Sequence, residues 1–360
     1  MKSTTMLWGI VLFSVMSWLF FKAMDKKENE LEGDNRGIPA DVEIPVADTG
    51  DPKCGGLGLA TYLFNRGEDI GVNGAIESVV AAGVRWERSH LPFRLTNDSA
   101  GWEEVRQVLS MAKEARLCNL IVLHGGPPSQ RTAEGSREGC NEPFAPTLKA
   151  WAQEAVKEVG ALVDGWEILN EPDLPTFFCG TPEEGLAVVV SIVEGLRESG
   201  VGVPVLLPSL TSCLALDCPE GAAWRKEFIQ LLAIEPLNVD ALNIHIYSRP
   251  PHDALSQLEG QVRGTWMEEL PLWITETNTA VNGVGDEAAY GAGMEERLQE
   301  ILEAFSSSTF RRGPIFWFNL KNGAWNKPTG LLDSRTGMKR VAFRRFGWIA
   351  KDFPLAEEGD

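Results

Sequence analysis

Residues 165–172 read Gly-Trp-Glu-Ile-Leu-Asn-Glu-Pro, a short apolar run that ends in polar residues. Seven further apolar runs of similar length occur in the chain, and each is followed by a segment whose apolar residues return every three or four positions. This alternation is typical of parallel strands joined by crossover helices. The eight predicted strands cover residues 58–63, 83–90, 119–124, 165–170, 203–209, 241–247, 272–276 and 314–319.

Eight strand-and-helix units are the number that closes a (β/α)₈ barrel, and 360 residues accommodate one such domain with elaborated loops. The competing architecture is an open doubly wound sheet, which usually carries a glycine-rich phosphate turn after its first strand. The glycine-rich segment here, Cys54-Gly-Gly-Leu-Gly58, precedes the strand instead. The sequence therefore predicts an α/β protein with a single TIM barrel over residues 54–353. We expect helices over residues 102–116, 145–159, 182–198 and 287–305.

The first 53 residues differ from the rest in composition. Residues 1–23 contain an apolar run from Met6 to Phe21, which is shorter than the roughly 20 residues of a comfortable membrane span. We expect a signal peptide or a membrane anchor there, followed by an acidic, proline-containing linker over residues 24–53. The chain is accordingly expected to be exported, and to be secreted, periplasmic or tethered to a membrane with its barrel outside the cytoplasm.

Charge and cysteine content narrow the range of partners. With 33 Lys and Arg against 51 Asp and Glu, the chain carries a formal charge of -18 and offers no basic face for nucleic acid. The four histidines and six cysteines show no spacing typical of metal ligands, so we expect no metal and no cofactor. In an exported chain the cysteines permit disulfides. We expect the pairs Cys213–Cys218 and Cys140–Cys179. The alternative is that some of the cysteines are free buried thiols, with Cys118, directly before an apolar strand, as the first candidate.

Two of the predicted strands end in a glutamate. Glu171 follows the fourth strand, and Glu276 ends the seventh strand in Leu272-Trp-Ile-Thr-Glu276. Because function gathers at the C-terminal strand ends of a barrel, these side chains are expected to face each other at about 5 to 5.5 Å, the separation that double displacement at a sugar carbon requires. The charge of Glu276 would then raise the proton affinity of Glu171. The alternative for either residue alone is a helix cap or an ion pair on the rim.

The sixth predicted strand alternates between two faces. Its apolar residues point one way, and Asn243, His245 and Tyr247 point the other. A purely structural parallel strand would be apolar on both faces. We therefore expect these three side chains to face the lumen, with Tyr247 donating a hydrogen bond to Glu276, although His245 could also be a buried histidine satisfied by a neighbour.

Three further residues at predicted strand ends are candidates for the same site. Arg88 lies near the end of the second strand, where a fixed positive charge would hold Glu276 ionised. The strand's register decides, however, which of its charged residues faces the lumen, and Arg85 and Glu87 could be a surface pair. His124 closes the third strand and would form part of the pocket wall. Trp317 lies in the last strand, where its indole would give a sugar ring a stacking platform, unless it is a core aromatic.

Several motifs together are similar to those of a known family. They are Gly83-Val-Arg-Trp-Glu-Arg88, Trp166-Glu-Ile-Leu-Asn-Glu-Pro172, Ile244-His245-Ile-Tyr247, Trp273-Ile-Thr-Glu276 and Thr329-Gly-Leu-Leu-Asp333 with the following Lys339. Over most of residues 55–350 the chain resembles the clan A glycoside hydrolases, the retaining (β/α)₈ glycosidases. The segment Leu123-His-Gly-Gly-Pro-Pro128 looks most like the β-xylosidase and endoglucanase-like branches.

The resemblance implies a role for each matching residue. Glu171 would be the acid/base and Glu276 the nucleophile, while Asn170 would hydrogen-bond the sugar 2-hydroxyl. Side chains expected to complete the carbohydrate site are those of Arg88, His124, His245, Tyr247 and Trp317. The implied substrate is a β-linked glycoside or polysaccharide. Glu87 and Leu169 depart from the family pattern and put the identity of the sugar in doubt. Two other hypotheses are a catalytically inactive, carbohydrate-binding or surface-interaction barrel and a lyase or metal-dependent barrel enzyme.

Overall fold

Parallel strands of the computed structural model form one sheet, in the order β5-β4-β3-β2-β1-β9-β8-β7-β6. The structure describes residues 54–61, 63–64, 71–96, 98–124, 145–175, 177–212, 219–247, 249–279, 287–318, 320, 330–332, 339 and 341–353. The strands are β1 (Leu57–Ala60), β2 (Trp86–Pro92), β3 (Cys118–His124), β4 (Gly165–Ile168), β5 (Val205–Leu206), β6 (Leu210–Thr211), β7 (Leu242–Ile246), β8 (Leu272–Thr277) and β9 (Arg312–Phe318).

The sheet closes on itself where its two edge strands, β5 and β6, come together. β5 lies within the strand expected over 203–209 and pairs with β4, whereas β6 begins just after that range and pairs with β7. Pro208, which lacks a backbone N–H, lies between these two short strands. A bridge between Leu206 and Ala241 joins the edges, and Leu207 N donates to Ala241 O at 3.0 Å. The eight predicted strand positions and the (β/α)₈ barrel are thereby confirmed.

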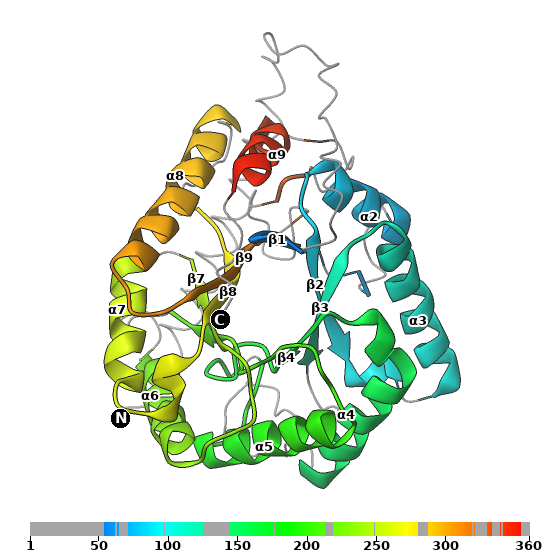
Figure 1. The fold of residues 1–360 in the computed structure, drawn as a ribbon, viewed down its shortest axis with the longest axis vertical. Coiled ribbons are helices and arrows are strands. Elements are labelled where there is room, and N and C mark those ends of the chain that lie inside the picture. The colour runs from blue at the N-terminus through cyan, green and yellow to red at the C-terminus, as the bar shows by residue number, and fades with distance from the viewer. Residues whose placement is uncertain are drawn as a thin grey trace, which may run out of the picture. The chain divides into compact units, whose positions relative to one another are not determined.

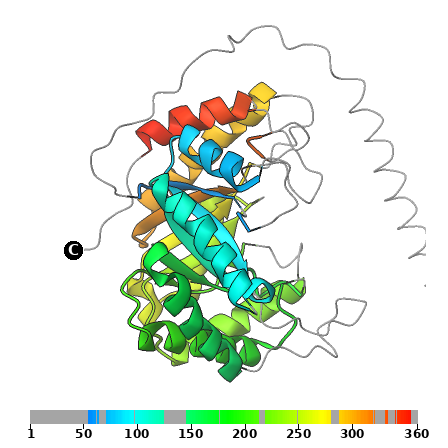
Figure 2. The same ribbon diagram turned by 90° about the vertical axis from the view of Figure 1, so that its right-hand side faces the viewer.

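Helices surround the strands (Figure 1). They are α2 (Gly71–Ala81), α3 (Ser99–Glu114), α4 (Ala145–Val159), α5 (Pro182–Glu198), α6 (Pro219–Ile234), α7 (Pro251–Val262), α8 (Glu287–Ser306) and α9 (Val341–Asp352), with short 3₁₀ turns at Phe93–Thr96, Gly160–Leu162 and Trp266–Glu269. α5 begins at a capping box in which the Thr181 hydroxyl accepts from Glu184 N and the Glu184 carboxylate accepts from Thr181 N. α9 packs beside α8, as Figure 2 also shows, and lies between α8 and α2 in the ring of helices.

Large apolar side chains fill the barrel interior near the beginnings of the strands. This inner cluster consists of Trp86, Cys118, Leu120, Leu206, Ala241, Trp273 and Phe316. Gly58 makes room for it, because a Cβ at this position would lie 2.7 Å from atoms of both Trp86 and Phe316. A separate and larger core lies between the strands and the helices. The inner cluster forms an aromatic floor of the barrel and confines any polar site to the opposite, C-terminal end of the strands.

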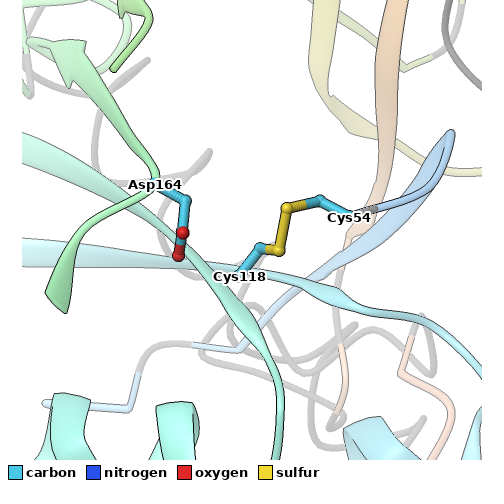
Figure 3. Close-up of side chains that lie close together, drawn as sticks. All are labelled: Cys54, Cys118 and Asp164. Atoms are coloured by element: carbon cyan, nitrogen blue, oxygen red, sulfur yellow. A yellow bond between two sulfur atoms is a disulfide. The ribbon is translucent and has the colours of Figure 1, made fainter. Parts of the chain in front are cut away.

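A disulfide joins Cys54 to Cys118 beside this aromatic floor, with the Cα atoms 5.7 Å apart. Figure 3 shows the two sulfur atoms bonded to each other and Asp164 nearby. The alternative of a free thiol at Cys118 is therefore wrong, because the start of β3 lies within disulfide reach of the residues before β1. Cys179 is also disulfide-bonded. The other residues of the two expected pairs, Cys140, Cys213 and Cys218, lie outside the described residues.

The described residues all fall within one compact unit, Ile44–Gly283 with Glu287–Asp360. Among them, no helix is sufficiently long and apolar to cross a membrane. The apolar run from Met6 to Phe21 and the acidic linker expected over 24–53 lie outside the described residues.

Candidate active site

Polar side chains occupy the barrel above the aromatic floor. Buried polar residues of the inner face are Arg88, Glu167, Asn243, His245, Thr275 and Glu276. β7 alternates as expected, since Leu242, Ile244 and Ile246 belong to the outer core while Asn243 and His245 make polar contacts with side chains of other strands. The lumen at this end is thus lined by charge and hydrogen-bonding groups that are shielded from water.

Glu171 is held by an unusual backbone conformation. Leu169 and Glu171 both have positive φ angles, of 56° and 44°, which non-glycine residues seldom adopt. Leu169 N donates to Leu123 O at 3.1 Å, and Glu171 N donates to Ser209 O at 2.9 Å. Neighbouring strands therefore fix the turn that directs the Glu171 carboxyl over the barrel, as is common where strain is stored at functional sites.

A β-bulge places two consecutive side chains of β8 on the lumen side. Ile244 of β7 pairs with Ile274, but the next residue, His245, pairs with Glu276, so Thr275 is the extra residue. In a regular strand Thr275 and Glu276 would point to opposite faces, whereas a bulge re-aims one of them. Trp273 faces the inner cluster and Ile274 the outer core, so Thr275 faces the lumen by ordinary alternation and contacts His245, and the bulge brings Glu276 to the same side.

One guanidinium group connects the buried carboxylates. Arg88 donates from Nε and Nη2 to the two Glu167 oxygens at 2.7 and 2.6 Å, a bidentate ion pair. Its Nη1 donates to Glu276 Oε1 at 2.5 Å, and its Nη2 also donates to Asn170 Oδ1 at 2.9 Å. Arg88 thus fixes the ends of β4 and β8 relative to each other, besides supplying positive charge to Glu276.

Glu276 and Glu171 meet across the lumen. The hydroxyl of Tyr247 donates to Glu276 Oε2, so both oxygens of Glu276 accept a hydrogen bond, as an ionised carboxylate does. One oxygen of each carboxyl and one nitrogen of His245 all lie within 4.8 Å of one another. This distance between the two nearest oxygens is compatible with the roughly 5 to 5.5 Å between the carboxyl groups of retaining glycosidases.

The environment of Glu171 favours its protonated form. Burial raises its pKa to about 7, the positive charge of Arg88 opposes the rise, and the negative charge of Glu167 adds to it. From the sequence we expected the charge of Glu276 to raise the proton affinity of Glu171, but desolvation is the principal cause of the raised pKa. His245 Nδ1 lies 2.8 Å from Glu171 Oε1, and burial lowers the pKa of His245, so its ring is neutral near pH 7.

Asp173, two residues after Glu171, serves as an anchor. It is fully buried, and it accepts hydrogen bonds from Thr211 N at 3.2 Å and from Thr211 Oγ1 at 2.5 Å. Arg225 lies 3.5 Å away as an ion-pair partner. These contacts tie the loop after β4 to β6 and thereby support the position of Glu171.

The two remaining predicted site residues, His124 and Trp317, lie in different surroundings. His124 lies at the end of β3, with its ring 5.0 Å from that of His90 and 5.7 Å from that of Phe177, in a position suited to the pocket wall. Trp317 has no exposed surface and packs in the outer core, with its ring 6.4 Å from Phe346 of α9. It therefore cannot present an indole face to a sugar. The next residue, Phe318, lies beside Tyr247 at 5.7 Å.

Sequence reasoning did not assign Glu167, Thr275 or His90 to the site. Glu167 could have been found, because it lies two residues before Leu169 in an otherwise apolar strand, where a buried carboxylate needs a cationic partner. Thr275 was missed because Glu276 was expected to face the lumen, and in a regular strand the residue before it would point the other way; the bulge that brings both inward depends on pairing between β7 and β8. Glu87, which departs from the family pattern, points away from the lumen and accepts from Thr61 and Ser89, each at 2.8 Å.

Two groups of described side chains lie close enough together to hold a cation. In the first, Cys54 and Cys118 are bonded to each other, and Asp164 accepts from Lys113. The second is the site itself, where the guanidinium of Arg88 contacts Glu276 directly and supplies positive charge at that carboxylate. The carboxyl pair therefore has a positive partner from within the chain.

A parallel barrel with two carboxyl groups facing each other at the strand ends is the architecture of many glycoside hydrolases. Residues 151–338, slightly more than half of the chain, match the family described as glycosyl hydrolase catalytic core. The chain belongs to this family and is a glycosidase. No curated protein is similar enough in sequence to match it.

Several solved structures with the same fold are glycosidases. The β-glycosidase BGL167 has a TM-score of 0.60 at 14% identity, over 86% of this chain and 100% of that one. A GH39 β-xylosidase from Caulobacter crescentus has a TM-score of 0.62 at 15% identity, over 84% and 72% of the two chains. A GH5_18 enzyme from Bifidobacterium longum subsp. longum, in complex with Manβ1-4GlcNAc, has a TM-score of 0.62 at 14% identity, over 84% and 79%. These matches establish a shared fold.

Proposed function

We propose that this chain is a retaining glycosidase that cleaves a β-linked glycoside or polysaccharide by double displacement. Glu276 attacks the anomeric carbon, and Glu171 protonates the leaving oxygen. A glycosyl–Glu276 ester forms as the glycosidic bond breaks. Glu171 then takes a proton from the water that hydrolyses this ester, which restores both carboxyls to their starting states.

The observation that carries the proposal is the approach of the two carboxyls to within 4.8 Å in unlike environments. Glu276 accepts donors on both oxygens, which suits an ionised nucleophile. Glu171 has a raised pKa, which suits an acid that keeps its proton near pH 7. Their separation favours direct attack over activation of an intervening water.

The surrounding side chains support contacts with carbohydrate. Asn170, held by Arg88, is the candidate for the sugar 2-hydroxyl, and His124 is a candidate for the pocket wall. Tyr247 orients the nucleophile and lies beside His245. Phe318, which lies beside Tyr247, is the apolar neighbour of the site in place of Trp317, the residue expected from the sequence.

A panel of β-linked aryl glycosides and polysaccharides tests the proposal, with the first-formed anomer followed by proton NMR. Retention predicts that the β-anomer accumulates first and mutarotates later. An α-anomer as first product would contradict the double-displacement mechanism. Protein carrying Glu276→Ala, prepared in the same way, controls for contaminating glycosidases.

We also propose that the barrel works outside the cytoplasm. The Cys54–Cys118 disulfide supports this, because disulfides persist mainly in oxidising compartments. Alkylation of free thiols before mass spectrometry of protein from its native source should leave Cys54 and Cys118 unlabelled. Full labelling of both residues would contradict the proposal.

A further inference from the structure

A continuous chain of hydrogen bonds runs from Glu171 into the barrel wall. Glu171 Oε1 lies 2.8 Å from His245 Nδ1, and His245 Nε2 lies 3.1 Å from Thr275 Oγ1. Thr275 Oγ1 in turn donates to Asn243 Oδ1 at 2.7 Å. All four side chains are buried, so water does not replace any of these partners freely.

The direction of each bond follows from the number of hydrogens available. Thr275 has a single hydroxyl hydrogen, and Asn243 Oδ1 receives it, so Thr275 can only accept from His245. His245 Nε2 must therefore carry the ring proton. Because a neutral imidazole carries one N–H, Nδ1 is left as an acceptor, and the bond to Glu171 requires the proton to reside on Glu171.

Arg88 does not reverse this direction, although its Nη2 lies 3.5 Å from His245 Nε2. The two hydrogens of Nη2 are directed to Glu167 Oε1 at 2.6 Å and to Asn170 Oδ1 at 2.9 Å. The amide nitrogen of Asn243 has no hydrogen-bond partner among the described residues, so this amide acts on the chain through its carbonyl oxygen.

We propose that Thr275 and Asn243 are positioning residues that hold His245 in its Nε2–H tautomer and thereby keep the catalytic proton on Glu171. The role of Glu171 as acid rests on the proposed function, whereas the tautomer rests on the geometry alone. A bare Nδ1 opposite Glu171 favours the neutral acid, and burial raises the pKa of Glu171 in the same direction. After Glu171 gives its proton to the leaving oxygen, the same arrangement favours recovery of a proton from water.

Two substitutions should reverse the tautomer by different routes. Thr275→Val removes the acceptor of Nε2–H, so the ring proton resides on Nδ1 and is donated to Glu171, which releases its own proton to solvent and becomes ionised. Asn243→Leu leaves Thr275 in place but frees its hydrogen for Nε2, which has the same effect. Thr275→Ser keeps the hydroxyl and should preserve the wild-type tautomer. Thr277→Val is the matched control, because Thr277 is a buried threonine of the same strand that donates to Ile246 O.

The other titratable and charged groups around this chain of hydrogen bonds stay unchanged in these variants. Those facing Glu171 and His245 are Arg88 and His90 of β2, Glu167 of β4, Asp173 after β4, Tyr247 after β7 and Glu276 of β8. A change common to Thr275→Val and Asn243→Leu, but absent from Thr277→Val, therefore reports on the tautomer of His245.

The direct measurement is ¹⁵N NMR of the whole chain labelled at its four histidines, with peaks assigned by single His→Gln variants. We expect Nε2–H for His245 in wild type and Thr275→Ser, and Nδ1–H in Thr275→Val and Asn243→Leu. An Nδ1–H tautomer in wild type, or no change in either variant, would overturn the inference. This readout needs no substrate, so it stands even if the proposed function fails.

Kinetics provide the second measurement. In Thr275→Val and Asn243→Leu the alkaline limb of kcat/KM should move to lower pH by about one unit, because the Nδ1–H donor stabilises ionised Glu171. Thr275→Ser and Thr277→Val should retain the wild-type limb. If both variants hydrolyse glycosides with retention and their alkaline limb of kcat/KM does not move, the glycosidase proposal stays intact and the positioning role is contradicted.

Discussion

Nη1 of Arg88 lies 2.5 Å from Oε1 of Glu276, while the rest of the same guanidinium forms a bidentate pair with Glu167. Three buried charges therefore share one contact network, with a net charge closer to zero than the carboxylates alone would have. Removing one member of such a network leaves the others desolvated and unpaired.

Arg88→Met should lower the free energy of unfolding by about 3 to 5 kcal/mol, because Glu167 and Glu276 lose their buried cation. Urea denaturation at pH 7 measures this loss. Arg106→Met is the matched control, since Arg106 pairs with Glu103 and Glu158 at a partly exposed position and should cost far less than Arg88→Met. Equal costs for the two substitutions would contradict the network described for Arg88.

Glu171→Ala should separate substrates by their leaving groups. A substrate with a poor leaving group needs the proton of Glu171, so its kcat/KM should fall by about 10² to 10⁴-fold. The leaving group of an activated aryl glycoside departs without protonation, so the rate of the first step should fall far less for such substrates. The comparison requires a series of aryl glycosides of graded leaving-group pKa, and equal losses across the series would count against the acid/base assignment.

The activity of the wild-type enzyme should decline as pH rises through about 7. Glu171 acts as an acid in its protonated form, and burial places its pKa at about 7, so the competent fraction decreases above that value. Measurement of kcat/KM from pH 5 to 9 on a poor-leaving-group substrate checks this limb. A profile that stays flat between about pH 6 and 8.5 would contradict the assignment.

Glu87 provides a stability prediction that is independent of catalysis. Burial raises its folded-state pKa to about 7 from an ordinary value of 4.5, so its neutral form is stabilised by folding. This contribution is fully present below pH 4.5 and is lost as pH rises to about 7. Glu87→Gln should therefore gain on wild type by about 2 to 3 kcal/mol between pH 4.5 and pH 8.

Denaturant unfolding of Glu87→Gln and wild type at both pH values gives this difference directly. Glu77→Gln on the exposed face of α2 is the control and should show no pH-dependent gain. If Glu87→Gln behaves like Glu77→Gln, the buried carboxyl does not titrate between the two states as described.

The fold was predictable because its signal is repeated along the chain. Each strand is a short apolar run bounded by polar residues, and the helix predicted over 182–198 matches α5 (Pro182–Glu198). The run over 203–209 was predicted as one strand, whereas only β5 lies within it and a second short strand, β6, follows at Leu210–Thr211. Two strands form here because β5 pairs with β4 and β6 with β7, and a single run carries no information about its partners.

The meeting of Glu171 and Glu276 was predictable from their places at strand ends, and so was the inward face of β7. The placement of Trp317 was not, because β9 is apolar on both faces and its alternation gives no direction. The disulfide of Cys118 depends on the register between β1 and β3, across β2. Local sequence does not encode such relations between strands.

Covalent trapping tests the central claim most directly. Incubation with a 2-deoxy-2-fluoro glycoside bearing a good leaving group, followed by peptide mass spectrometry, should find one sugar attached to Glu276 and none in protein carrying Glu276→Ala. Turnover of the parent glycoside without any adduct on Glu276, or an adduct on another residue, would contradict the account.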